Sequence, residues 1–258
     1  MDQMTSGAGQ RVAPAGSRSW GFWATLLWGL AGVVAWFTAQ FVVFVVFVTW
    51  RLKGDPGSAD AKTLLTDGLL LSLATLAAAP AWIGVCALAA RARGWRVRDY
   101  LALQMPRRGE VVFGVACLIA LLVAFDGLTW LIGRELVPSF MSESYRSARL
   151  QGTLPLLLLA VVVVAPLCEE IAFRGFLFRG FAASPLGVLG ALVITSAAWA
   201  LMHVQYDVFV VGLIFGIGLL LGWLRWASGS TALTIMLHML SNFVACVQTA
   251  IKVEWLSN

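Results

Sequence analysis

The amino-acid sequence predicts an all-α fold, a polytopic transmembrane helix bundle with about seven to eight spans. Of its 258 residues, 60% are hydrophobic and only 12% are charged, and the mean hydropathy is +0.86. This composition lies outside the range of soluble domains. A spanning helix needs about 20 mostly apolar residues. Runs of this kind occur seven times, at 20–50, 69–90, 111–132, 154–178, 186–203, 207–225 and 231–251.

The chain divides into a polar N-terminal tail, residues 1–19, and a single membrane domain, residues 20–258. The first apolar run is far longer than the core of a signal peptide, so we expect a retained helix. Its excess length allows a split into two helices, which would give the eighth span. Six arginines fall within 91–108, against three basic residues in 51–68 and three in 133–153, which predicts that 91–108 is cytoplasmic. The N-terminus is then inside and the C-terminus outside.

The net charge of +5 does not indicate a nucleic-acid partner. The basic residues stand in connections beside apolar helices, where they meet lipid headgroups and set the orientation of the chain. No internal repeat is visible in the sequence, which disfavours the repeat architecture of secondary transporters. The composition therefore points to a function inside the membrane, in contact with the lipid bilayer.

Three ionisable residues, Glu169, Glu170 and Arg174, interrupt the apolar run 154–178. A charged side chain at a helix centre costs roughly 2.5 to 3.5 kcal/mol on insertion scales, and such residues usually mark a functional site. Glu170 and Arg174 are four residues apart, so they share one helical face in the favourable order for an ion pair. Glu169 points about 100° away from Glu170 and is left for chemistry. An alternative is that the ion pair only joins two helices while Glu169 sits in water at a helix end.

The sequence contains only two histidines, His203 and His238, and both fall in apolar runs. Asn242 follows His238 by four residues and shares its helical face. Glu169 and His203 are each about 15 to 18 residues from a turn near 182–185, so at 1.5 Å per residue they lie at a similar depth. His238 lies only about ten residues past its own turn, so a meeting with Glu169 requires tilted or projecting helices.

These residues together carry a resemblance to a known family. The pattern begins with Glu169-Glu170-x-x-x-Arg174-Gly175. Trp199 and His203 follow, separated by three residues, and His238-x-x-x-Asn242 comes last. It resembles the CPBP family of CAAX proteases and bacteriocin-processing (Abi) proteins, which includes the glutamate-type CaaX prenyl endopeptidases. The resemblance covers about residues 154–243, the expected catalytic core. Trp199 departs from the more common Phe, which puts the fit of a substrate in doubt more than the chemistry.

The resemblance implies an intramembrane endopeptidase. Glu169 matches the catalytic glutamate and His203 its partner, and together they would activate a water molecule that reaches them through a cavity. His238 and Asn242 match the pair that stabilises the oxyanion, while Glu170, Arg174 and Trp199 have supporting roles. The implied substrate is a membrane-tethered peptide or protein, either CaaX-like and prenylated or bacteriocin-like. The implied location is the cytoplasmic (inner) membrane of a bacterium.

Two questions stay open at this point. A divalent metal such as zinc could use Glu169, His203 and His238 as ligands, and proteins with these motifs are often classed as metalloproteases, whereas the resemblance to the glutamate-type prenyl endopeptidases favours hydrolysis without a cofactor. A non-catalytic immunity or scaffold protein is the alternative to an enzyme. A proton-coupled transporter with a Glu/His relay is a further alternative.

Overall fold

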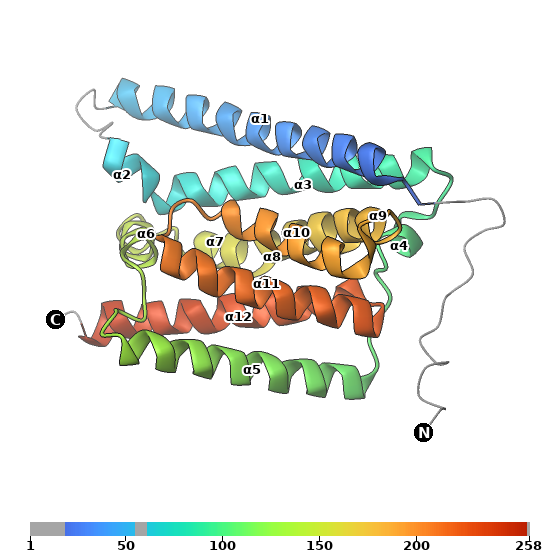
Figure 1. The fold of residues 1–258 in the computed structure, drawn as a ribbon. Coiled ribbons are helices and arrows are strands. Elements are labelled where there is room, and N and C mark those ends of the chain that lie inside the picture. The colour runs from blue at the N-terminus through green and yellow to red at the C-terminus, as the bar shows by residue number, and fades with distance from the viewer. Residues whose placement is uncertain (1–18, 55–60, 257–258) are drawn as a thin grey trace.

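A computed structural model describes residues 19–54 and 61–256, and these are almost entirely helical (Figure 1). The prediction of an all-α polytopic bundle is confirmed. The predicted tail, residues 1–19, lies outside the described residues except for its last position. The elements in chain order are α1 (Phe22–Gly54), α2 (Ala61–Leu65), α3 (Gly68–Ala92), α4 (Val97–Tyr100), α5 (Arg108–Leu131), α6 (Ser139–Leu150), α7 (Leu154–Leu158), η1 (Leu159–Val164), α8 (Ala165–Glu170), η2 (Ile171–Leu177), α9 (Phe178–Ala182), α10 (Gly187–Leu201), α11 (Val208–Ser228), α12 (Thr231–Ile251) and η3 (Lys252–Leu256).

All seven predicted apolar runs form helices, but only six are long enough to cross a membrane by length and composition. The exception is α10, which has 15 residues. At 1.5 Å per residue it extends about 22 Å, less than the roughly 30 Å of bilayer hydrocarbon. The chain leaves the helix at Met202 and reaches α11 through the turn 202–207. The first run does not split, because α1 continues as one helix of 33 residues.

The fourth span is a continuous helix built from α7, η1, α8, η2 and α9, and it contains two π-helical stretches. The first, η1, ends at Val164, two residues before Pro166. Proline has no backbone N–H and its ring crowds the carbonyl four residues earlier, so regular i→i−4 bonding cannot pass this point. A π-helical turn holds more residues than an α-helical turn, so side chains along it change direction relative to a regular helix. These stretches flank the predicted glutamates on both sides.

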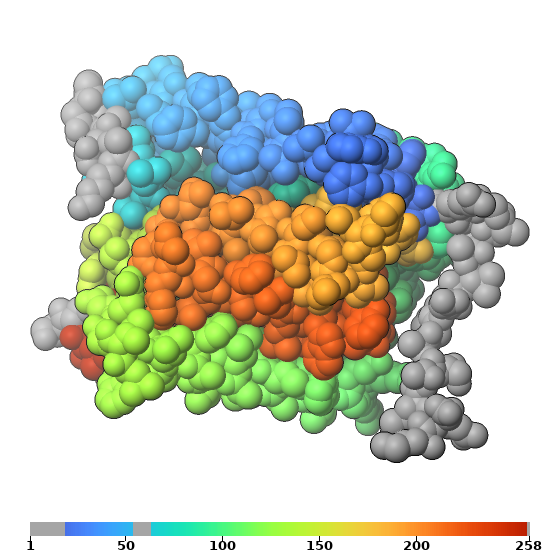
Figure 2. Space-filling view, in the orientation of Figure 1, coloured from blue at the N-terminus to red at the C-terminus, as the bar shows by residue number. Residues whose placement is uncertain are grey.

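The fourth span lies in the middle of the bundle, between α1 and α3 on one side and α5 and α12 on the other (Figure 1). Its η2 segment packs into the main core with large aromatic residues such as Trp82, Phe173 and Phe176, which are at most 2% exposed. On the face shown in Figure 2, α10 and α11 cover the middle of the molecule, with α1 above and α5 and α6 below. The central helix is thus enclosed by protein, which can compensate its buried charges.

The two ends of the bundle differ. α4 and the arginine-rich segment 91–108 stand at one end, whereas α6 stands at the other (Figure 1). Within the arginine-rich segment, Trp95, Tyr100 and Leu101 are buried in the main core. This segment closes one end of the bundle.

Candidate active site

Glu169, on α8, lines a cavity with a volume of about 800 Å³. Its side chain is 22% exposed, in contrast to the fully buried Glu170 beside it. Glu169 Oε2 accepts a hydrogen bond of 2.5 Å from the indole Nε1 of Trp199, on α10. The carboxylate is therefore both oriented by protein and open to the cavity, as a group that reacts with a ligand or with water must be.

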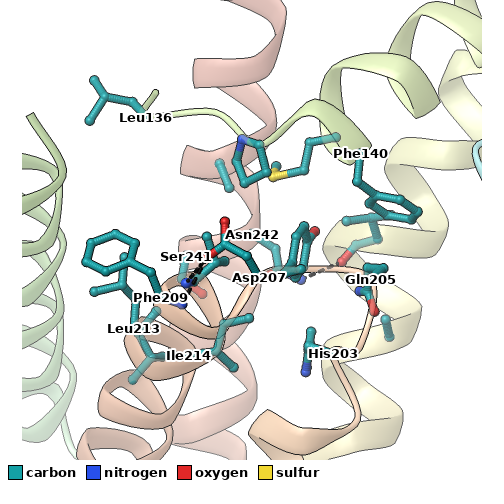
Figure 3. Close-up of a pocket in the computed structure, with 18 of the residues that line it drawn as sticks. Leu136, Phe140, His203, Gln205, Asp207, Phe209, Leu213, Ile214, Ser241 and Asn242 are labelled. Carbon is teal, nitrogen blue, oxygen red and sulfur yellow. Dashed lines mark hydrogen bonds between the residues drawn. The ribbon is translucent and has the colours of Figure 1, made fainter. Parts of the chain in front are cut away.

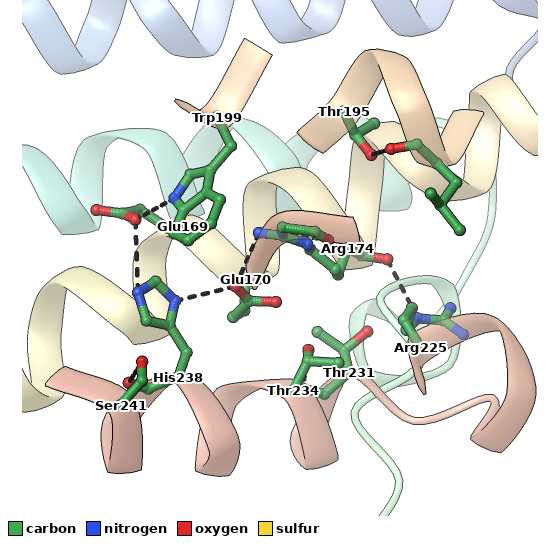
Figure 4. A network of polar contacts seen from close by, with 12 residues as sticks. Glu169, Glu170, Arg174, Thr195, Trp199, Arg225, Thr231, Thr234, His238 and Ser241 are labelled. Atoms are coloured by element: carbon green, nitrogen blue, oxygen red, sulfur yellow. Dashed lines mark hydrogen bonds and ion pairs between the residues drawn. The ribbon is translucent and has the colours of Figure 1, made fainter. Parts of the chain in front are cut away.

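His238, on α12, lies between the two glutamates (Figure 4). Its Nδ1 is 3.0 Å from Glu170 Oε1, and its Nε2 is 4.0 Å from Glu169 Oε2. A carboxylate accepts hydrogen bonds, so Nδ1 carries a proton and donates to Glu170. The second ring nitrogen is thereby directed toward Glu169 and the cavity. His238 and Glu169 thus meet, a contact that residue counting expected only with tilted or projecting helices.

Glu170 and Arg174 form the predicted ion pair, with 2.9 Å between Arg174 Nη1 and Glu170 Oε1 and both side chains fully buried. Arg174 Nη2 also donates to the carbonyl of Gly218, at 3.1 Å. The guanidinium lies 4.6 Å from the ring centroid of Trp199, a cation–π contact. Two buried charges are stabilised only by good geometry and additional hydrogen bonds. The pair has both, and it joins the fourth span to α10, α11 and α12.

His203 follows α10 in the turn that leads to α11, and it lines the same cavity. Its Nδ1 is 2.9 Å from the carbonyl oxygen of Trp199. Because a carbonyl only accepts, Nδ1 carries the proton and Nε2 is left as an acceptor. The ring packs edge-on against Trp199 at 5.3 Å between centroids. Within residues 19–54 and 61–256 we find no direct hydrogen bond or ion pair between His203 and Glu169.

Asn242 lies one turn after His238 on α12 and also lines the cavity (Figure 3). Its Nδ2 donates a hydrogen bond of 2.8 Å to the carbonyl of Val161, in η1. An amide nitrogen carries two protons, so one N–H is left for the cavity. The structure thus brings Glu169, Trp199, His203, His238 and Asn242 to one cavity, and it places Glu170 and Arg174 behind them.

Sequence reasoning did not single out several polar residues that line the cavity, among them Gln205, Tyr206 and Ser241. The rings of His203 and Tyr206 are nearly parallel, with centroids 6.3 Å apart. Burial raises the pKa of the Tyr206 hydroxyl to about 12, so this group is a neutral donor at physiological pH. The short polar sequence 203–207 between two apolar runs could have been used to predict the turn between α10 and α11.

The residues do not form a metal-ligand set. Among the described residues, no three His, Cys, Asp or Glu side chains are grouped so that they could hold an ion. His203 and His238 each direct Nδ1 to a protein oxygen, and only His238 approaches Glu169 within 4.0 Å. Zinc sites need ligand atoms about 2.0 to 2.3 Å from one metal position. We therefore derive no step through a metal.

Comparison with known proteins adds to this geometry. Residues 151–244 match the family model described as type II CAAX prenyl endopeptidase Rce1-like. The chain is also 33% identical over 133 residues to an Escherichia coli protein described as an uncharacterized 24.3 kDa protein. That alignment covers 49% of this chain and 60% of the relative. No solved structure matches. The Rce1-like match includes every site residue named above, and it supports the membership of this chain in the CPBP, or CAAX protease, family.

Proposed function

We propose that this chain is an intramembrane endopeptidase that hydrolyses a peptide bond in a membrane-associated polypeptide. The observation that carries the proposal is the position of Glu169. Its partly exposed carboxylate faces a cavity of about 800 Å³ inside a bundle of apolar helices, and two imidazoles and an amide line the same cavity. A peptidase that uses water needs a positioned base and donors for the developing oxyanion, in a site with restricted access to solvent.

In the proposed first step, a water molecule binds between the Glu169 carboxylate and His203 Nε2. Nδ1 of His203 donates to the Trp199 carbonyl, and in the neutral imidazole Nε2 is then the acceptor for a hydrogen bond from this water. Glu169 takes the proton while the water oxygen attacks the carbonyl carbon of the scissile bond. The carbonyl becomes an oxyanion. When the C–N bond breaks, the proton held by Glu169 passes to the leaving amine.

His238 and Asn242 are the proposed donors to the oxyanion. His238 already donates from Nδ1 to Glu170, so a second proton on the ring would let Nε2 donate into the cavity. Asn242 has one N–H beyond the bond that it makes to Val161. Donors fixed before the reaction are worth several kcal/mol when charge develops, because they need no reorganisation. Hydrolysis in this scheme involves no metal, and we place the protein in a bacterial cytoplasmic membrane.

The test compares new peptide termini in membranes from cells that produce wild-type protein, Glu169→Gln or Asp126→Asn at equal abundance. Asp126 is a matched control, because it is an intramembrane carboxylate that accepts a hydrogen bond from Gln248 and does not line the cavity. Termini that appear with wild type and Asp126→Asn and vanish with Glu169→Gln support the proposal. If the termini persist with Glu169→Gln, the proposal is wrong and a non-catalytic immunity or scaffold role takes its place.

A further inference from the structure

The cavity that holds Glu169 extends toward one end of the bundle. Part of its lining comes from the connection between α5 and α6, including Arg134, from the first turn of α6, including Phe140, and from the turn before α11, including Gln205. Figure 3 shows Leu136 and Phe140 in the upper part of the view and His203 below them. These segments stand at the end of the bundle where α6 lies (Figure 1). Water and substrate therefore reach Glu169 from this end.

The opposite end is closed by the segment around α4. Tyr100 and Leu101 are fully buried there, and the Thr231 hydroxyl donates to the Leu101 carbonyl at 2.6 Å. Arg179 Nη1 donates to the carbonyls of Asp99 and Tyr100, each at 2.8 Å. No residue of α4 lines the cavity. These hydrogen bonds hold the segment around α4 to α9 and α12, apart from the residues that line the cavity.

The charges at the two ends show which side of a membrane each end faces. At the α6 end, four basic residues form ion pairs, Arg51–Asp67, Arg134–Asp207, Arg149–Glu254 and Lys252–Glu135, while Lys53 and Arg146 are in none of the ion pairs found among the described residues. At the α4 end, none of the ion pairs found in the described part of the chain includes Arg91, Arg96, Arg98, Arg107 or Arg108.

Basic residues in short connections accumulate on the cytoplasmic side of a membrane, where anionic headgroups attract them. The six arginines that gather in the single short connection 91–108, against three basic residues in each of 51–68 and 133–153, thus assign the α4 end to the cytoplasm. The α6 end then faces the opposite side.

We propose that the active-site cavity opens to the extracytoplasmic face of the membrane. Its substrates are then polypeptide segments exposed on that face or in the outer half of the bilayer, such as a translocated peptide or a membrane protein's external segment. A lipidated C-terminus displayed in the cytoplasm would not reach Glu169. The statement about substrates rests on the proposed peptidase function, whereas the side of access does not.

The side of access is tested by cysteine labelling in spheroplasts with a membrane-impermeant maleimide. Ser139→Cys reports the cavity mouth and Ala92→Cys reports the α4 end, since both positions are exposed and uncharged. The background lacks the native cysteines, which are Cys86, Cys117, Cys168 and Cys246. If that background does not accumulate, labelling is scored as the increase over wild type. A cytoplasmic thiol protein controls for intact membranes.

We expect Ser139→Cys to be labelled in intact spheroplasts and Ala92→Cys only after lysis. Labelling of Ala92→Cys before lysis, with the cytoplasmic control unlabelled, would overturn the proposal. The peptide termini that depend on Glu169 give the second readout, and we expect them in extracytoplasmic segments. Termini confined to cytoplasmic segments would overturn the statement about substrates. Failure of Glu169→Gln to abolish any terminus would instead reject the peptidase function and leave the labelling result standing.

Discussion

The indole N–H of Trp199 donates a 2.5 Å hydrogen bond to the carboxylate of Glu169. The same ring also lies 4.6 Å from the guanidinium of Arg174 and packs edge-on against both His203 and His238. One aromatic side chain therefore orients the proposed base and separates it from the buried cation behind it. The departure from Phe at this position, which we linked only to substrate fit, gives Glu169 a hydrogen-bond donor that Phe lacks.

Trp199→Phe is expected to lower kcat/KM by roughly tenfold or more while the protein stays folded. The substitution keeps an aromatic ring in place but removes the N–H, and a hydrogen bond to a charged group is worth about 1.5 to 3 kcal/mol. Trp199→Ala should also lower the unfolding midpoint, since it removes the ring that packs against Arg174. The comparison requires cleavage assays and thermal unfolding of both variants in the same detergent. Equal activity of Trp199→Phe and wild type would reject a positioning role for this bond.

Arg174→Met is expected to destabilise the protein by about 3 to 5 kcal/mol, because it leaves Glu170 buried without its cation. The double variant Glu170→Gln with Arg174→Met should recover part of this loss, since a neutral amide oxygen at position 170 can still accept from His238 Nδ1. Abundance in membranes and the unfolding midpoint measure the effect. A double variant no more stable than Arg174→Met would contradict the importance of the stranded charge.

The two histidines should respond differently to alanine. His203 lies in a turn and is partly exposed, so His203→Ala should lower the rate by about 10² to 10⁴ without lowering the unfolding midpoint. His238 is 3% exposed and bonded to buried Glu170, so His238→Ala should lose activity and also about 1 to 3 kcal/mol of stability. Rates and midpoints for the two variants separate these outcomes. The assignment of roles fails if His203→Ala cleaves at the wild-type rate.

Tyr206 predicts a pH dependence of stability. Burial raises the pKa of its hydroxyl to about 12 in the folded protein, against about 10 in an unfolded chain. The neutral form therefore favours the folded state below about pH 10, and this contribution is lost as the pH rises toward 12. Tyr206→Phe has no phenol to ionise, so its unfolding midpoint should fall less than that of wild type between about pH 9 and pH 11. An identical fall in both proteins would show that Tyr206 is not buried in this way.

Much of the fold followed from the sequence, because apolar runs of about 20 residues have few alternatives to spanning helices. The exception was the run 186–203, whose hydropathy does not reveal that the helix ends at Leu201. The ion pair between Glu170 and Arg174 followed from their four-residue spacing. The amphipathic helix α6 was missed, since its polar sequence resembles that of any connection outside the membrane.

The site could be predicted only in part. Residue types and spacing selected Glu169, His203, His238 and Asn242, and the structure brings all four to one cavity. Their partners could not be predicted, because contacts between distant helices depend on packing and on the π-helical stretches around Glu169. Counting residues at a regular rise gave only the condition that the helices tilt or project for His238 to meet Glu169. The hydrogen bond from Trp199 to Glu169 could not be predicted for the same reason.

The central claim is that the Glu169 carboxylate accepts the proton of the water that cleaves the substrate. It is tested most directly by single-turnover cleavage with purified wild type, Glu169→Gln and Asp126→Asn in lipid nanodiscs, with a peptide taken from a substrate found by terminal sequencing. We expect Glu169→Gln to slow cleavage by about 10² to 10⁴ with unchanged binding and unfolding midpoint, while Asp126→Asn cleaves as wild type does. A Glu169→Gln protein that cleaves within about twofold of the wild-type rate, far less than the loss of a general base allows, would contradict the claim.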